Sequence, residues 1–239
     1  MDLTAIRRLL TAVRQEGRLA LTEPEALAVL DLAGIRVTRA GVAGTVTEAV
    51  ALARELGFPV VMKIVSPDIL HKSEAGGVRV GVTSEREVRA AYRALVARAR
   101  AVRPTAAIRG ILVQAQVAAG VEAIVGSTTD PQFGPVVMFG AGGLLVELLG
   151  DVTFRVAPLT RDDAADMLAE IRATKLLDGF RGQPPVDRAA LVDAIVRLGT
   201  LAYELRDEIR EVEVNPLILA RDGVTAVDAL LTLHPVAVA

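Results

Sequence analysis

Residues 60–82, VVMKIVSPDILHKSEAGGVRVGV, constrain the fold more than any other stretch of the chain. Apolar and β-branched residues fill positions 59–65, and Val78, Val80 and Val82 alternate with polar or small residues, so the pattern predicts two strands. Pro, Ser, Asp and Gly residues bound each apolar run and predict a loop between them. The stretch is therefore expected to form a strand, a polar loop and a second strand.

Charged residues and glycines in this stretch are suited to phosphate. Lys63 lies in the first apolar run, and Lys72, Gly76 and Gly77 lie in the loop. Lysine supplies a compact positive charge near neutral pH, and glycines allow a backbone to approach a polyphosphate and leave N–H groups available. We therefore predict that the loop handles phosphate.

His71 lies in the same loop. A lone histidine is more often a structural residue than a chemical one, but the neighbours Asp68, Lys72 and Glu74 are too polar for an apolar core face. Imidazole has a reference pKa of about 6.5, so a neutral histidine can act as a nucleophile at cellular pH. The polar surroundings favour this second interpretation.

The composition excludes several classes of function. The chain has 239 residues, a formal net charge of -2, 3% aromatic residues and no cysteine. Neither a basic surface nor aromatic stacking platforms are therefore expected for nucleic acid, and disulfides and thiolate chemistry are excluded. Apolar residues make up 52% of the chain, yet no uninterrupted run reaches the roughly 18 residues that cross a bilayer. Because the N-terminus also lacks a signal-peptide pattern, we expect a cytoplasmic protein that binds no membrane.

Hydrophobic periodicity and capping signals predict an α+β chain. The apolar runs at 108–117, 122–128 and 134–139 follow one another closely and predict a meander, whereas 172–185 is expected to be irregular. Helices outside two facing sheets fit the order of elements better than a strict βαβ succession. The other predicted elements are helices at 3–16, 22–34, 45–57, 84–102, from 160 and at 187–205, and strands at 35–42, 59–65, 78–82, 152–157, 211–219 and 225–230.

Polar residues on the predicted C-terminal strand pair form a candidate metal site. Glu213 and Asn215 are two residues apart and therefore face the same side of a strand, and Asp228 can come alongside from the next strand. Oxygen ligands gathered in this way suit Mg²⁺, which takes one or two protein groups and completes its shell with water and phosphate oxygens. A solvated strand face is the alternative, but the surrounding apolar residues predict burial, where an unpaired carboxylate is costly. We therefore predict a functional role for all three residues.

Two polar residues on the middle strands are weaker candidates. Glu122 begins an apolar strand just after Gly120 and, taken alone, is more simply a charge at a strand edge. Gln114 on the preceding strand suits a hydrogen bond to a nucleobase edge, and a buried amide satisfied by the backbone explains it equally well. The residues alone leave both roles open.

Four segments are distinctive when taken together and in order: GFPVVMKIVSPDILHKSEAGGV, GVEAIVGSTTDPQFGPVVMFGAGG, ELLGDVTFRVAPL and EVNPL. With them, nearly the whole chain resembles the ATP-grasp (β) subunit of nucleoside-diphosphate-forming acyl-CoA synthetases, the ADP-forming acetate–CoA ligase type. Succinyl-CoA synthetase β is a more distant relative. The resemblance implies an ATP-grasp fold in which two α+β subdomains enclose a nucleotide cleft. The smaller subdomain is expected at 20–108 and the larger at 1–19 and 109–233, followed by a tail at 234–239.

The resemblance also implies roles for individual residues. His71 would take a phosphoryl group from a phosphohistidine on an α-subunit and bring it to ADP, and Glu213 would orient that phosphohistidine. Mg²⁺ would be held by Asn215 and Asp228. The nucleotide, ATP or ADP, would be bound by Lys63, by the loop with Lys72, Gly76, Gly77 and Val78, and by Gln114, Val117 and Glu122.

The resemblance further implies an acid–thiol ligase that is incomplete without a partner. Such synthetases need a CoA-binding domain and a ligase domain, which 239 residues do not accommodate beside an ATP-grasp fold. We expect an α-subunit with both domains and an α2β2 heterotetramer. One alternative is a non-catalytic ATP-grasp module that regulates an acyl-CoA or protein-acylating enzyme, although the complete residue set argues against decay. Another is a carboxylate–amine ligase, which shares the fold but does not use the histidine.

Overall fold

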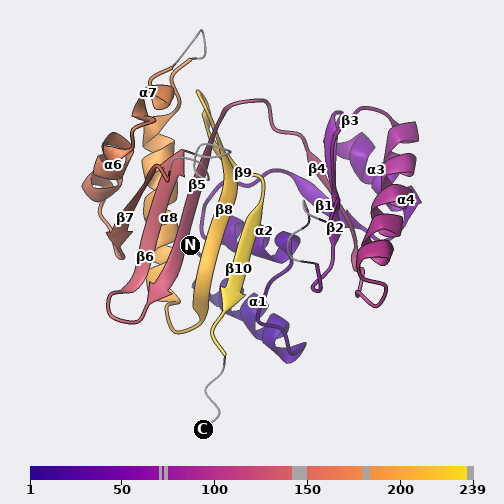
Figure 1. Ribbon diagram of the computed structural model, residues 1–239, viewed down its shortest axis with the longest axis horizontal. Coiled ribbons are helices and arrows are strands. Elements are labelled where there is room, and N and C mark those ends of the chain that lie inside the picture. The colour runs from indigo at the N-terminus through magenta and orange to yellow at the C-terminus, as the bar shows by residue number, and fades with distance from the viewer. Residues whose placement is uncertain (70–71, 73–74, 142–149, 180–183, 236–239) are drawn as a thin grey trace. The chain divides into compact units, whose positions relative to one another are not determined.

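The computed structural model describes residues 1–69, 72, 75–141, 150–179 and 184–235. The chain divides into two units (Figure 1). Within the described residues, each unit contains one β-sheet. Unit 1 comprises Met1–Leu21, Glu25–Val37 and Ala119–Ala239, and unit 2 comprises Thr22–Pro24 and Thr38–Ala118.

Unit 2 is a four-stranded antiparallel sheet with two helices packed against it (Figure 1). Thr45 and Glu48 form a complete capping box at the start of one helix, and the Ser84 hydroxyl accepts from the Glu87 N–H at the start of the other. Both helices therefore begin where the local sequence predicts. The strand order is β1 (Ala40–Ala43), β4 (Gly110–Ala115), β2 (Val60–Val65) and β3 (Val78–Val82), and the helices are α3 (Val46–Leu56) and α4 (Glu85–Val102).

The two faces of the unit 2 sheet differ in chemistry. Met62 and Ile64 of β2 join the apolar core formed with α3 and α4. Because successive residues of a strand point to opposite faces, Lys63 lies on the face away from these helices. Its cross-strand neighbour in β4 is Leu112, and Gln114 lies two residues further along the same strand. We call this face, which carries Lys63 and Gln114, the lysine face.

Unit 1 is built on a six-stranded antiparallel sheet. Its centre is a hairpin of β5 (Val121–Asp130) and β6 (Gly134–Ala141), and β8 (Ile209–Ala220) pairs with the other side of β5. Helix α8 (Arg188–Glu204) packs on these three strands, and α6 (Arg161–Glu170) packs on α8 (Figure 1). The strand order is β10 (Ala229–Leu233), β8, β5, β6 and β7 (Val152–Val156), with β9 (Gly223–Ala226) also paired to β8, and the other helices are α1 (Leu3–Gln15), α2 (Glu23–Leu32) and α7 (Thr174–Leu177).

Strand β8 contains a bulge at Asn215 and Pro216. These two residues together oppose Ile124 of β5. Val214 before the bulge and Leu217 after it are both buried, so the alternation of buried and exposed residues shifts by one position. An extra residue in one strand has this effect in β-bulges. Asn215 is consequently exposed between two buried stretches of the same strand.

Gly199 of α8 allows that helix to approach its neighbours closely. A Cβ atom at this position would lie 2.7 Å from Leu159 Cδ2 and 3.3 Å from Val137 Cγ2. Gly199→Ala is therefore expected to lower the free energy of unfolding by about 1–3 kcal/mol, because overpacking displaces neighbouring side chains. Urea denaturation measures the change.

Gly44→Ala is the matched control for this substitution. A Cβ atom there would come no closer than 3.4 Å to another residue, at Glu48 Oε2. The control should stay within about 0.5 kcal/mol of the wild type. Equal losses in the two variants would contradict a packing origin.

The structure corrects the predicted placement of one strand. β4 is the first of the three strands predicted as a meander, but it pairs with β1 and β2 and not with β5. The units divide accordingly: residues 109–118 belong to unit 2, although the sequence assigned 109–233 to the larger subdomain. Glu25–Val37 belongs to unit 1, although the sequence assigned 20–108 to the smaller subdomain.

Smaller differences concern the C-terminal third. The strand predicted at 225–230 is divided into β9 and β10, which pair with different halves of β8. The short helix α7 forms within the stretch predicted as irregular. The first residue of the predicted tail, His234, is fastened through its backbone to Glu208 and Arg14. In the part of the chain that the structure describes, no helix is long and apolar enough to cross a membrane.

Candidate functional site

Lys63 lies inside β2, where all six residues are buried. Its side chain is 7% exposed, and its Nζ lies 2.6 Å from Glu23 Oε1. A buried ammonium group needs such a partner, because the loss of hydration is otherwise uncompensated. The predicted position of Lys63 on a strand is confirmed, whereas its burial and its carboxylate partner were not predicted.

Glu23 is the residue that sequence reasoning missed. It begins α2, where Pro24 in the first turn is tolerated because the N–H groups there have no intrahelical acceptor. Its second oxygen, Oε2, lies 3.0 Å from Lys72 Nζ, and the Glu23 side chain is only 3% exposed. No local signal reveals these pairs, because an acidic residue is ordinary at a helix start and Lys63 lies 40 positions away.

The turn at Gly76 and Gly77 closes the loop against β2. The Gly77 N–H donates to the Lys72 carbonyl at 2.7 Å, and the Gly77 carbonyl accepts from the Ile64 N–H at 2.8 Å. Gly76 has a φ of +61°, which L side chains rarely adopt, and a Cβ on Gly77 would lie 2.6 Å from Ile64 Cγ2. Both positions therefore favour glycine. The prediction that glycine N–H groups are available to phosphate does not hold for Gly77, whose N–H is used inside the turn.

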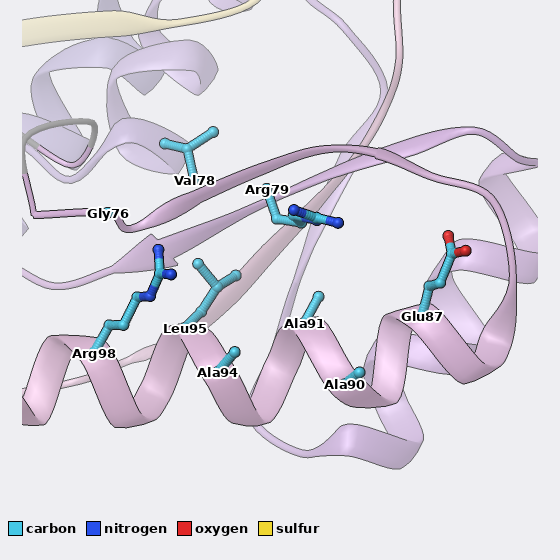
Figure 2. A pocket seen from close by; sticks show the side chains of 9 residues that line it. All are labelled: Gly76, Val78, Arg79, Glu87, Ala90, Ala91, Ala94, Leu95 and Arg98. Atoms are coloured by element: carbon cyan, nitrogen blue, oxygen red, sulfur yellow. The ribbon is translucent and has the colours of Figure 1, made fainter.

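A groove of about 280 Å³ lies between α4 and the start of β3 (Figure 2). Arg98 reaches toward Gly76, where an added Cβ would lie 2.9 Å from one guanidinium nitrogen. Near the start of α4, the N–H and hydroxyl of Thr83 donate to Glu87 and hold the pKa of that carboxyl below its usual range. The groove lies beside the helix, and Lys63 does not line it. Its lining residues are Gly76, Val78, Arg79, Glu87, Ala90, Ala91, Ala94, Leu95 and Arg98.

Gln114 and Val78 are the other predicted residues that the structure places on the lysine face. Gln114 is 2% exposed and lies opposite Val61 of β2, while Val78 lies opposite Lys63. Val117 is half-buried in the segment that follows β4. Unit 2 therefore brings together most of the residues predicted to bind nucleotide.

In unit 1, Glu213, Asn215 and Asp228 meet at the bulge of β8. The Asn215 side-chain amide donates to Glu213 Oε1 at 3.2 Å, which confirms that these two residues face the same side. The Asn215 backbone N–H donates to the Asp228 carbonyl at 3.3 Å. Glu213 and Asp228 are half-buried, but Asn215 is exposed, contrary to the burial predicted for it. The bulge explains this exposure.

The oxygen atoms of this group suit Mg²⁺. Magnesium prefers carboxylate and carbonyl oxygens, and it commonly takes only one or two protein ligands beside water and substrate phosphates. Among the described residues, no group of three or more His, Cys, Asp or Glu side chains is placed to hold a metal ion by itself. The donor set therefore fits a metal ion that arrives with a phosphate ligand.

Two predicted residues belong to neither group. Glu122 lies opposite Ile218, four positions along β5 from Gly126, the partner of Glu213. This separation corresponds to about 13 Å along the strand, and Glu122 is exposed there. His71, the predicted phosphoryl acceptor, lies outside the described residues.

Comparison with known proteins identifies the family of this chain. A sequence profile of the ATP-grasp domain matches residues 12–233. The β subunit of ADP-forming acetate–CoA ligase I from Pyrococcus furiosus is 47% identical over 227 residues, which cover 95% of this chain and 97% of that protein. The chain belongs to the ATP-grasp family of ADP-forming acyl-CoA ligase β subunits.

Solved structures agree with this assignment of the ATP-grasp chain. The dinucleotide-forming acetyl-coenzyme A synthetase 1 of Ca. Korarchaeum cryptofilum, in complex with coenzyme A, Ca-AMPCP and HgCl⁺, matches with a TM-score of 0.93 and 49% identity. The match covers 95% of this chain and 99% of the other. A second structure of that synthetase, with coenzyme A and Mg-AMPPCP, matches with a TM-score of 0.84, 46% identity and coverage of 96% and 100%. Its phosphohistidine segment points towards the nucleotide-binding site. The ATP-grasp fold predicted from the resemblance is confirmed.

Proposed function

We propose that this chain is the nucleotide-binding subunit of an ADP-forming acyl-CoA synthetase and moves a phosphoryl group between ATP or ADP and a phosphohistidine. Similarity over almost the full length to a protein named as the β subunit of an ADP-forming acetate–CoA ligase supports the proposal. In this chain, the observation that carries it is the pair of the buried Lys63 and the half-buried Lys72, which meet at one carboxylate. Two neighbouring ammonium groups suit the closely spaced charges of a polyphosphate.

The proposed reaction is a phosphoryl transfer with His71 as shuttle. An oxygen of the ADP β-phosphate bonds to the phosphorus of phosphorylated His71 while the P–N bond breaks, and the released imidazole nitrogen regains a proton. His71 is itself loaded when its neutral imidazole nitrogen bonds to the phosphorus of a phosphohistidine of the α subunit. The P–N bond of that phosphohistidine breaks, and its released imidazole takes up the proton that His71 gives up. Because the transferring group spreads its charge over three oxygens, Lys63 and Lys72 would act by positioning and by electrostatic stabilisation.

Asp228 and Asn215 are the proposed ligands of Mg²⁺ in unit 1. The bound ion would neutralise part of the phosphate charge. Glu213 accepts a hydrogen bond from the Asn215 amide, which fixes the orientation of both side chains. We propose that this fixed carboxylate orients the phosphohistidine, since a carboxylate that accepts from one imidazole nitrogen leaves the other free to carry the phosphoryl group.

The remaining predicted residues have proposed roles in binding the nucleotide. Gln114 offers an amide on the lysine face for a nucleobase edge, and the half-buried Val117 offers an apolar contact. Glu122, exposed on β5, is proposed to accept from nucleoside donor groups. The turn with Gly76, Gly77 and Val78 is proposed to set the position of Lys72 relative to the phosphates, because the Gly77 N–H holds the Lys72 carbonyl.

We propose that a companion α subunit supplies the CoA-binding and ligase domains. The Pyrococcus relative is named a β subunit, and two of the Korarchaeum synthetase structures are complexes with coenzyme A. The proposed assembly is α2β2. Co-expression of the two chains followed by light scattering should give the mass of the heterotetramer, and a lone stable β chain under the same conditions would contradict this part.

Labelling with [γ-³²P]ATP and Mg²⁺ tests the proposed function. The wild-type chain with its partner should take up label that is stable in base and lost in acid, and peptide mapping should place that label on His71. His71→Ala should take up none. If the wild type with its partner binds ATP and takes no label, the chain is a regulatory ATP-grasp module or a carboxylate–amine ligase.

A further inference from the structure

One carboxylate lies against both of the lysines to which the proposed function assigns the phosphates. Glu23 Oε1 lies 2.6 Å from Lys63 Nζ, and Glu23 Oε2 lies 3.0 Å from Lys72 Nζ. The two oxygens of one carboxylate thus lie against two different ammonium groups. The two lysines come from a strand and from a loop, and the Glu23 carboxylate is a contact that they share.

The depths of the three side chains show on which side the carboxylate lies. Exposure of the side chains is 3% for Glu23, 7% for Lys63 and 13% for Lys72. Glu23 is thus the most deeply buried side chain of the three. The carboxylate therefore contacts the two lysines from the more deeply buried side.

The use of lysine in the chain supports a specific role for this cluster. The sequence contains 27 Lys and Arg residues together, and only three of them are lysines: Lys63, Lys72 and Lys175. Arginine thus supplies positive charge almost everywhere else. Two of the three lysines meet at Glu23, where a compact charge with freely rotating donors is present instead of a planar guanidinium.

We propose that Glu23 is a positioning residue for phosphate binding, which fixes the spacing and direction of the Lys63 and Lys72 ammonium groups. This inference rests on the proposed function. Glu23 does not touch the phosphates but holds the groups that do. Without its charge, the two neighbouring ammonium groups repel each other, and the lysine on the loop moves away from the one on the strand.

Binding of AMP, ADP and ATP to the full chain, measured by calorimetry with Mg²⁺, tests this role. In the wild type the affinity should rise from AMP to ATP as more phosphates meet the lysines. Glu23→Gln should raise the ATP dissociation constant by about tenfold or more and change the AMP dissociation constant much less. The gain in affinity from AMP to ATP should therefore be smaller than in the wild type. Glu23→Asp keeps the charge and should recover part of this gain.

Glu25→Gln is the matched control. Glu25 lies on the same helix and also makes a double ion pair, with Arg18, at 2.7 and 2.9 Å. This variant should bind all three nucleotides as the wild type does. If Glu23→Gln keeps the full gain from AMP to ATP, or loses affinity for all three nucleotides equally, Glu23 has no positioning role.

The outcomes separate this inference from the proposed function. If the wild-type chain does not bind ATP, the proposed function itself is contradicted. If Glu23→Gln binds ATP as the wild type does, only the role of Glu23 is contradicted. Circular dichroism reports whether each variant is folded. If Glu23→Gln does not fold, Glu23→Asp provides the test. Its shorter carboxylate should reduce the gain in affinity from AMP to ATP, and an undiminished gain would overturn the inference.

Discussion

Lys63→Met is expected to raise the dissociation constant of the chain for Mg-ATP by at least about 100-fold, since removing the cation from a desolvated contact with phosphate costs several kcal/mol of binding. Methionine keeps the unbranched apolar stem of lysine, so the packing of β2 should survive. What is lost is the ammonium group that contacts Glu23 Oε1 at 2.6 Å. The summed charge of Lys63, Lys72 and Glu23 falls from +1 to zero, which weakens the attraction for a polyphosphate.

The control for this variant is Lys175→Met. Lys175 lies in α7 and is exposed, so its loss should leave ATP binding unchanged. Calorimetric titration of both variants and the wild type gives the comparison, and thermal unfolding shows whether Lys63→Met remains folded. If folded Lys63→Met has a dissociation constant for ATP within threefold of the wild-type value, Lys63 does not bind the phosphates.

Asp228→Asn is expected to lower the rate of ATP-dependent labelling of the complete enzyme by about 100- to 1,000-fold. Asparagine has nearly the same shape, and the Asp228 backbone carbonyl, which accepts from the Asn215 N–H, is unaffected. The substitution removes the negative charge of a residue whose backbone contacts that of Asn215, and Mg²⁺ binding depends on carboxylate charge. The concentration of Mg²⁺ required for half-maximal labelling should therefore rise as well.

Asp222→Asn tests whether this effect is local. Asp222 lies in the exposed turn between β8 and β9, six positions before Asp228. Its substitution should change neither the labelling rate nor the Mg²⁺ requirement. A labelling rate for Asp228→Asn that matches the wild type at low Mg²⁺ would show that the metal ligands lie elsewhere.

Features determined by neighbouring residues were predictable from the sequence. Helices α3 and α4 begin at Thr45 and Ser84, because a hydroxyl followed three residues later by glutamate satisfies the first N–H groups of a helix. The common orientation of Glu213 and Asn215 follows from strand periodicity, and their hydrogen bond confirms it. Even the bulge of β8 has a signal, since the spacing of Val214 and Leu217 breaks the two-residue alternation.

Features determined by distant residues were not predictable. β4 has the composition of any buried strand, and its pairing with β1 and β2 depends on residues about 50 to 70 positions earlier. The sequence placed it with β5 because that strand is nearest along the chain. Glu23 was missed for the same reason: its partners become visible only when α2, β2 and the loop before β3 are seen together.

The division of the chain into units has a consequence for exchanging modules between related ligases. Residues 22–24 are grouped with unit 2, although the residues on both sides of them are grouped with unit 1. A gene cassette for residues 38–118 would encode every strand of the four-stranded sheet and both lysines, but it would omit Glu23. A chimera must therefore take two separate pieces from one parent if lysines and carboxylate are to remain matched.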